Sequence, residues 1–241
     1  MPAGAGTLKC PSDSVPTGTV CIDTYEASVW QIPPSNTALI KKVQEGKITS
    51  AADLSGATQR GVSGHDYPPV CPDTGNGCKD DYAVSIAGVT PSAFITWFQA
   101  QVACRNAGKR LATNAEWQAA ALGTPDPGTD NGTSDCNIST HTVVNTGSRS
   151  SCVSDVGAFD MVGNLWEWVA DWGNLATGCQ TWDAAHGNDV SCIGGNGTGG
   201  LPGALFRGGN FDLGSFAGVF AAVGLFGPTD VGNSIGFRCA R

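Results

Sequence analysis

Cysteine and histidine are the side chains of this chain that most readily carry redox, nucleophilic or metal chemistry. The 241 residues include ten cysteines, an even set without a CxxC pair. Thiolate zinc sites usually take two ligands from one tight turn, so this spacing favours disulfides formed in an oxidising compartment. Buried free thiols in a reducing compartment are the alternative.

The three histidines are His65, His141 and His186, and they are widely spaced in the sequence. We expect them at surface or loop positions, where they form neither a metal triad nor a catalytic base.

Cysteines that are neighbours in sequence are the simplest disulfide partners. This rule suggests Cys10–Cys21, Cys71–Cys78, Cys136–Cys152 and Cys179–Cys192, and it leaves Cys104 for Cys239. Ten cysteines allow many other pairings, so the connectivity stays open at this point.

The composition indicates one turn-rich domain over residues 1–241. The chain has 34 glycines, 13 prolines and 14% charged residues, a composition typical of many short elements joined by loops. The formal net charge of -8 and the scattered Lys and Arg argue against a nucleic-acid-binding face, which needs clustered basic side chains. No run of about 18 apolar residues is present, so we expect no membrane span. The first ten residues lack the apolar core of a signal peptide.

Three helices are predicted from capping signals and periodicity. A polar helix is expected over residues 38–45. A second helix is expected after Thr90, which can cap it, and Gly108 can end it. A third begins at Thr113, because Thr113 and Glu116 have the spacing of a capping box. The side chains expected on one face of the second helix are Phe94, Trp97, Phe98 and Val102.

Strands are predicted near both ends of the chain and loops between them. Residues 21–31 alternate as a strand that carries Val29 and Trp30 inward. The Gly-, Asn-, Asp- and Ser-rich residues 122–157 are expected to form irregular structure. Short strands are expected from residue 205 onward. The aromatic side chains expected in the core are Trp166, Trp168, Trp172, Phe220 and Phe237.

Three separated blocks resemble the formylglycine-generating-enzyme (sulfatase-modifying-factor) domain. They are "GKRLATNAEWQAAA", "FDMVGNLWEWVADW" and "FRGGN" followed by "IGFRCAR". The resemblance covers roughly residues 20–241. It implies an α+β, C-type-lectin-like fold of the formylglycine-generating type, with two helices, small antiparallel sheets and many loops. It also supports the Cys104–Cys239 bridge, because the first helix and the final strand are neighbours in that fold.

The oxidising enzymes of this family need a reactive cysteine after the "RGG" block, whereas no cysteine lies between Cys192 and Cys239 here. We therefore predict that the chain is not an enzyme and has no catalytic cofactor. A formylglycine-generating-type oxidase, or a related sulfatase-modifying-factor enzyme, is the alternative.

A structural calcium ion is expected in "FDMVGNLWE". Asp160 and Glu167 can supply carboxylates, and Gly163 and Leu165 can supply backbone carbonyls, the hard oxygen ligands that Ca²⁺ prefers. These positions match a calcium loop of the family that the blocks resemble, and Asn137–Ile138 match part of a second. The alternative is that Glu167 caps a turn or pairs with an arginine.

The last 35 residues resemble the variable region of diversity-generating-retroelement proteins, which use the same type of domain. "RGGN", "AGVFA" and "IGFRCA" match the constant parts, and residues 207–241 are the candidate variable region. Retroelement mutagenesis of AAY codons cannot produce Lys, Glu, Gln, Met or Trp, and all five are absent here. The positions expected to vary and to bind a ligand are Phe211, Asp212, Leu213, Phe216, Val223, Leu225, Phe226, Asp230, Gly232, Asn233 and Ser234.

These patterns predict a variable, ligand-binding protein displayed on a cell or virion surface. Exposed Phe and Leu side chains would supply apolar contact area to a protein or other surface ligand, and Asp212 and Asp230 would add polar specificity. We expect Phe211, Phe216 and Phe226 on the surface. The resemblance leaves the ligand and the oligomeric state open.

Overall fold

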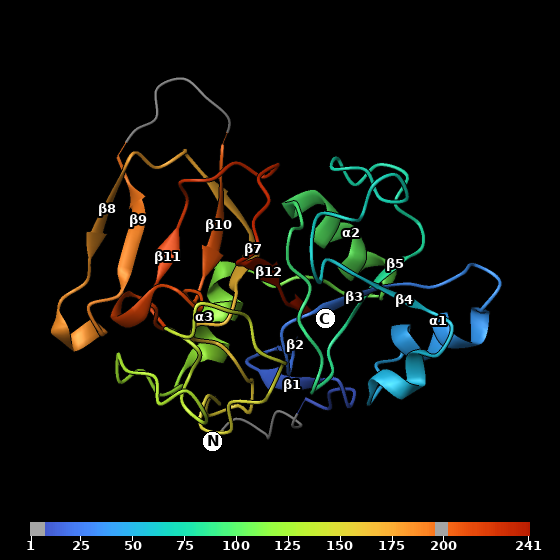
Figure 1. Ribbon diagram of the computed structural model, residues 1–241, viewed down its shortest axis with the longest axis horizontal. Helices are drawn as coiled ribbons and strands as arrows, with labels where there is room; N and C mark the ends of the chain where they lie inside the picture. The colour runs from blue at the N-terminus through green and yellow to red at the C-terminus, as the bar shows by residue number, and fades with distance from the viewer. Residues whose placement is uncertain (1–7, 196–201) are drawn as a thin grey trace, which may run out of the picture.

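The computed structural model describes residues 8–195 and 202–241, and it contains three α-helices in those ranges (Figure 1). The helices are α1 (Thr37–Gln44), α2 (Trp97–Asn106) and α3 (Asn114–Ala121). The expected polar helix is α1, capped by Asn36. The Thr113–Glu116 capping box opens α3 as predicted. The prediction that Thr90 caps α2 is wrong, because Thr96 and Gln99 form the capping box and Phe94 has a left-handed φ of 55° before it.

Three sheets form the β structure. The four-stranded sheet has the order β1 (Ser14–Thr17), β2 (Val20–Asp23), β13 (Cys239–Ala240), β6 (Arg110–Leu111). The three-stranded sheet has the order β4 (Thr58–Arg60), β3 (Ser28–Gln31), β5 (Asp81–Val84). The six-stranded sheet has the order β12 (Ile235–Phe237), β7 (Trp166–Gly173), β10 (Gly203–Arg207), β11 (Ala222–Val223), β9 (Val190–Gly194), β8 (Gly178–Thr181).

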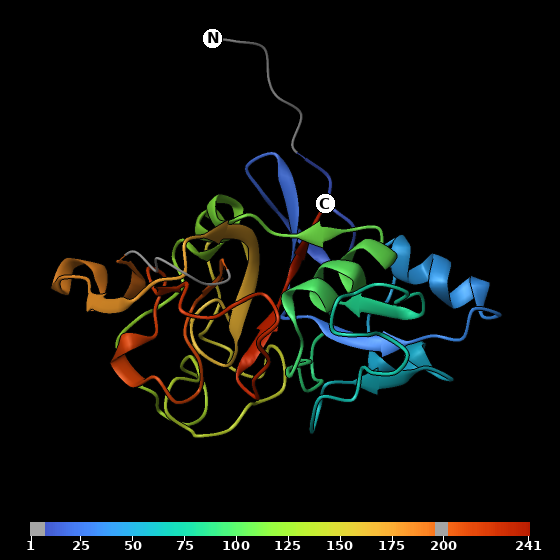
Figure 2. The same cartoon turned by 90° about the horizontal axis from the view of Figure 1, so that it is seen from above.

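The sheets divide the molecule into two halves. The three-stranded sheet, α1 and α2 lie in one half, and β7 to β11 lie with α3 in the other (Figure 1). The four-stranded sheet joins the two ends of the chain, because β13 pairs with β2 and with β6. Figure 2 shows the C-terminus beside the β1–β2 hairpin. Three short 3-10 helices complete the elements: η1 (Ala51–Leu54), η2 (Ala184–His186) and η3 (Gly214–Phe216).

The structure confirms the α+β class and changes some details. The six-stranded sheet is mixed, because β9 runs parallel to β11 and β7 runs parallel to β12. The expected strand over 21–31 is divided into β2 and β3, and Val29 and Trp30 are buried as predicted.

Most of the predicted core aromatic residues are buried. Trp166, Trp168 and Phe237 lie in the main core. The prediction is wrong for Trp172, which is exposed near the C-terminal end of β7, where its ring contacts Trp97 and Phe98. It is also wrong for Phe220, which is only half-buried and contacts Trp182 and His186 on the surface.

All ten cysteines are paired in the structure. The disulfides are Cys10–Cys21, Cys71–Cys78, Cys104–Cys239, Cys136–Cys152 and Cys179–Cys192, as the sequence suggested. Cys104–Cys239 ties α2 to β13 across 135 residues of sequence. Among the described residues, no helix has the length and apolar character needed to span a bilayer.

Candidate recognition site in the C-terminal segment

The C-terminal segment (residues 207–241) begins with an arginine that binds the backbone of a later turn. Arg207 ends β10, and its guanidinium donates to the carbonyls of Ala221 (2.8 Å) and Val219 (3.0 Å). The same group lies 4.7 Å from the ring of Trp117 in a cation–π contact. Burial lowers the pKa of Arg207 to about 10, so it stays charged at neutral pH. The "RGG" arginine therefore organises the "AGVFA" turn.

Two carboxyl groups hold the other side of that turn. Asp189 Oδ2 accepts from the N–H of Phe220 at 2.6 Å, and Asp126 faces the N–H of Val219. A Cβ at Gly218 would lie 2.1 Å from Asp189 Oδ1 and 2.3 Å from Asp126 Oδ2, so only glycine fits beneath the pair. The turn's carbonyls are thus bound by Arg207 and its N–H groups by the two aspartates.

The two aspartates share one site, and this changes how they titrate. Burial and the neighbouring carboxylate raise the pKa of Asp126 to about 7. Burial also raises the pKa of Asp189, against the opposing effect of the backbone N–H groups. Two adjacent carboxyls of this kind hold one proton between them over part of the acid to neutral range.

The "IGFRCA" block is held by a buried ion pair. The Arg238 guanidinium binds both oxygens of Glu167, at 2.6 Å and 2.5 Å, and also donates to the carbonyls of Asp23 and Phe159. Trp117 Nε1 donates to Glu167 at 2.7 Å. Both charged groups are fully buried. The pair therefore joins β12 and β13 to β7 and to the N-terminal strands.

The expected calcium residues lie in this same region. Glu167 has both oxygens engaged by Arg238 and Trp117, so arginine pairing, the alternative to a ligand role, is what the structure shows. A cation beside Glu167 would face the Arg238 charge, and Glu167 does not fit a calcium ion in this arrangement. Asp160 accepts from the N–H of Gly147 at 2.7 Å, and burial raises its pKa to about 6. Calcium binding by Asp160 and the carbonyls of Gly163 and Leu165 stays a prediction.

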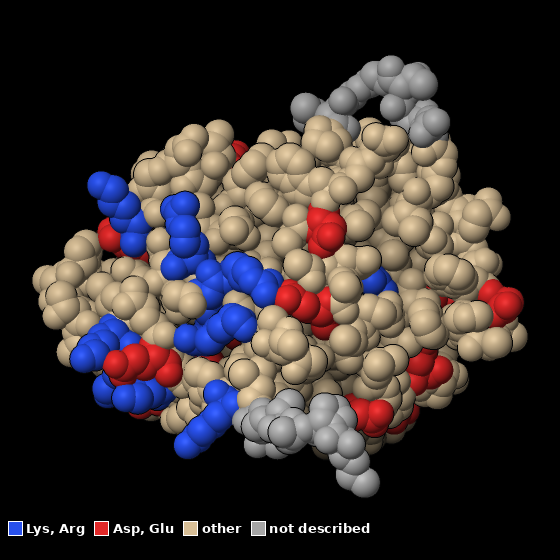
Figure 3. All heavy atoms as spheres, turned by 180° about the vertical axis from the view of Figure 1, so that it is seen from behind, with Lys and Arg blue, Asp and Glu red and all other residues tan. Residues whose placement is uncertain are grey.

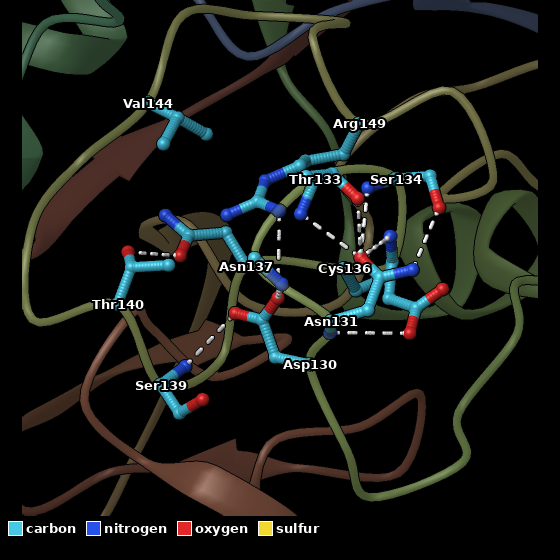
Figure 4. Close-up of polar contacts among 12 residues, drawn as sticks. Asp130, Asn131, Thr133, Ser134, Cys136, Asn137, Ser139, Thr140, Val144 and Arg149 are labelled. Carbon is cyan, nitrogen blue, oxygen red and sulfur yellow. Dashed lines mark hydrogen bonds and ion pairs between the residues drawn. The ribbon is translucent and has the colours of Figure 1, made fainter.

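A loop from the middle of the chain supports the first part of the segment. In Figure 4, Asp130 pairs with Arg149 at 3.4 Å, and Asn131 Oδ1 accepts from the N–H groups of the following turn. The Ile138 carbonyl of this loop accepts from Gly214 N at 2.8 Å. His141 N donates to the Phe211 carbonyl at 3.2 Å, and the His141 ring pairs with Asp212. The predicted irregular loop therefore forms a rigid support for residues 211–214.

Nine of the eleven predicted variable positions reach the surface, five of them exposed and four half-buried, and two lie in the core. Of the half-buried positions, Leu213 and Leu225 also pack against the main core. Phe216 is 48% exposed and Phe226 is 42% exposed, as predicted for both. The prediction that Phe211 is on the surface is wrong: it is 4% exposed and packs with Ala93 and Leu165. Val223 is also buried, in β11 between β10 and β9. The exposed or half-buried positions are Asp212, Leu213, Phe216, Leu225, Phe226, Asp230, Gly232, Asn233 and Ser234.

The nine surface positions form two groups instead of one surface. The 212–216 turn precedes β11 and the 225–234 loop follows it, and Figure 1 shows them at opposite ends of that strand. The 225–234 loop lies against the start of α2, because Trp97 N donates to the Pro228 carbonyl and Phe94 N to the Gly232 carbonyl. The 212–216 turn lies beside the β8–β9 hairpin (residues 178–194), where Phe216 lines a pocket of about 360 Å³.

Sequence reasoning missed the residues outside the segment that hold or border it. Asp126 and Asp189 lie in loops 63 residues apart, and no motif links them. The Gly187 and Gly218 positions that enclose their carboxyls are recognisable only in three dimensions. The Cys179–Cys192 pairing was predicted, but the surrounding residues were expected to form a loop, so the sequence indicated neither the β8–β9 hairpin nor its position beside Phe216.

The chain is similar to a curated protein and to several solved structures. A curated formylglycine-generating enzyme from Thermomonospora curvata is 34% identical over 101 residues, which cover 34% of this chain and 33% of that protein. Among solved structures, the P3c variant of a major tropism determinant aligns with a TM-score of 0.48 and 19% identity, covering 96% of this chain and 52% of that one. Variable protein 1 of Treponema denticola aligns with a TM-score of 0.38 and 20% identity, covering 64% and 71%.

The chain thus matches about a third of its curated relative and spans about half of the tropism determinant. The family described as the sulfatase-modifying factor enzyme 1-like domain matches residues 14–241, which is nearly the whole chain. The protein belongs to the sulfatase-modifying factor enzyme 1-like family.

Proposed function

We propose that this protein is a non-enzymatic receptor whose C-terminal segment is diversified by a retroelement and binds a protein or other surface ligand. One observation carries the proposal: within a single segment, the motif arginines contact the interior and most of the intervening residues reach the surface. Arg207 and Arg238 hold the backbone from inside, and nine of the eleven intervening positions reach the surface. A backbone held in this way keeps its shape when the surface side chains change.

The chemistry of the surface positions suits recognition. Phe216 and Phe226 expose large apolar side chains that have little reason to face water unless a partner covers them. Asp212, Asp230 and Asn233 are exposed polar groups of the same segment and can select between partners. The five disulfides suit an extracellular, cell-surface or virion-surface location, where they form and persist.

The enzymatic alternative is a formylglycine-generating oxidase, and similarity to one such enzyme favours it. Thiol-based oxidation needs a thiolate, and here every cysteine is engaged in a disulfide. Incubating the protein with a cysteine-containing peptide, with copper and a thiol reductant present, tests this alternative. We expect no aldehyde product by mass spectrometry; turnover would establish the enzyme.

The genome around the coding sequence tests the receptor directly. A nearby reverse transcriptase gene is expected, with a second copy of codons 207–241 that differs only at adenines. The adenine differences should fall on codons of the nine surface positions and leave Arg207, Gly218 and Arg238 unchanged. Absence of both the copy and the reverse transcriptase would contradict the proposal.

A further inference from the structure

We propose that the recognition face continues from the 212–216 turn onto the β8–β9 hairpin, and that it takes a protein partner whose surface presents Lys and Arg around an apolar anchor side chain. The inference rests on the proposed function and adds the partner's chemistry and a second, non-variable wall. Its observations are a shared pocket, a rigid connection between its walls, and the distribution of charge.

The pocket beside Phe216 is built mostly by the hairpin. Its lining residues are Cys179, Gln180, Thr181, Val190 and Phe216, so four of the five come from outside the variable region. With a volume of about 360 Å³, it can hold one large side chain of a partner. Phe216 of the 212–216 turn and Trp182 of the hairpin each have more than two-fifths of their surface exposed. An apolar anchor entering here would cover aromatic surface that water now contacts.

The two walls of the pocket are held at a fixed distance. The backbone of β9 pairs with β11, directly after the "AGVFA" turn, through Ser191 with Ala222 and Cys192 with Val223. Trp182 Nε1 donates to the Phe220 carbonyl at 3.2 Å. The Cys179–Cys192 disulfide closes the hairpin itself. Because both walls are anchored, the pocket exists before a partner arrives, which lowers the entropic cost of binding.

Charge is divided between the two halves of the molecule. Residues 111–240 contain only three basic Lys or Arg residues, Arg149, Arg207 and Arg238, and all three are buried. The exposed basic side chains are Lys9, Lys41, Lys42, Lys47, Lys79 and Arg105. On the face drawn in Figure 3, Lys and Arg gather toward one side.

The hairpin and the 212–216 turn therefore present carboxylates whose basic partners are histidines. Asp183 follows Trp182 on the hairpin with 72% of its side chain exposed, and Asp212 opens the 212–216 turn. Each of these carboxylates is paired with a histidine, His186 or His141. Interfaces match surfaces of opposite potential, and like charges are excluded. A partner with Lys and Arg around an apolar side chain fits this face.

A phage-displayed library of random linear peptides, selected on the immobilised full-length protein at low salt, tests the inference. Enriched peptides are expected to combine excess Lys and Arg with an aromatic or large aliphatic residue. A labelled enriched peptide is then titrated with the protein by fluorescence anisotropy. Binding should weaken as the salt concentration is raised, because salt screens the attraction between the peptide's Lys and Arg and the carboxylates around the pocket.

Two substitutions separate the walls. Thr181→Lys places a positive charge on the hairpin side of the pocket and should weaken peptide binding about tenfold or more, by like-charge repulsion. Phe216→Ser removes the variable wall and should weaken it to a similar degree. Thr58→Lys is the matched control, because Thr58 is an exposed threonine on β4, an edge strand of the basic half. It should leave binding unchanged, and all three variants should keep the parent's thermal unfolding midpoint.

The outcomes distinguish the inference from the proposed function. If Phe216→Ser weakens binding and Thr181→Lys does not, the hairpin wall is refuted and the variable segment keeps its role. Enrichment of acidic or uncharged peptides, or of none, overturns the predicted partner chemistry. If neither Phe216→Ser nor Phe226→Ser changes the binding of an enriched basic peptide that Thr181→Lys weakens, the variable segment is not the binding site, and both proposals fail.

Discussion

The motif positions and the intervening positions of residues 207–241 differ in burial and in the direction of their contacts. Arg207, Gly218 and Arg238 make their contacts inward, to Trp117, to the Asp126–Asp189 pair and to Glu167. Phe216 and Phe226 point to the surface. The difference teaches that the shape of this segment is set by partners elsewhere in the chain. Surface side chains of such a segment can change at small cost to folding.

Phe211 and Val223 are the exceptions, and they limit which positions are free to vary. Both lie between motif blocks, yet both are buried. Phe211 fills a small core with Ala93 and Leu165, and its backbone bonds to Asn164 and His141. Variation at these two sites is therefore expected to be restricted to apolar residues.

Loss of the Arg238–Glu167 pair should have the largest effect. Arg238→Met leaves the Glu167 carboxylate buried without its partner, which costs about 3–5 kcal/mol of unfolding free energy. Urea denaturation measures this cost. The exposed Arg105, changed to Met on α2, is the control and should stay within about 0.5 kcal/mol of the parent. Equal effects of the two substitutions would contradict the structural role of the "IGFRCA" arginine.

Phe211→Ser and Phe216→Ser form a matched pair with the next largest difference. Removing a buried phenylalanine ring costs about 3–5 kcal/mol, and an exposed one costs about 0.5 kcal/mol or less. The first substitution should therefore lower the unfolding midpoint sharply, and the second should not change it measurably. Differential scanning calorimetry gives both values. A Phe211→Ser protein as stable as the parent would place that ring on the surface after all.

A smaller effect is expected from pH at the Asp126–Asp189 pair. Its folded pKa values lie above the unfolded value, so the folded state binds more protons between about pH 4 and pH 7. The pair's contribution to stability is fully present below the unfolded pKa and is lost as pH rises through about 7. Asp126→Asn replaces the shared proton with an amide N–H donor. This variant should gain stability relative to the parent between pH 5 and pH 8; a difference independent of pH would exclude the shared proton.

Much of the fold could be predicted because its signals are local. The Thr113–Glu116 box, the four disulfides between neighbouring cysteines, and the buried Trp166 and Trp168 of β7 each follow from short spacing or residue type. The α2 start could not be predicted, because two threonines could cap it and the left-handed Phe94 decides between them.

The site was predicted less completely than the fold, because its supporting contacts are long-range. The AAY pattern identifies positions that can change, but codon identity carries no information on burial, so Phe211 and Phe216 look alike. Asp126 and Asp189 reach the "AGVFA" turn only after the loops around them fold. The β8–β9 hairpin meets Phe216 through the parallel pairing of β9 and β11, which sequence periodicity does not reveal.

The central claim is that the backbone of the segment is independent of its nine surface side chains. Asn233 is already asparagine, the residue that AAY codons specify, so replacing the other eight by asparagine tests this claim in one protein. Its thermal unfolding is then measured. We predict cooperative unfolding with a midpoint within about 5 °C of the parent. Loss of cooperative unfolding would show that these side chains belong to the core, and it would contradict a variable surface on a constant scaffold.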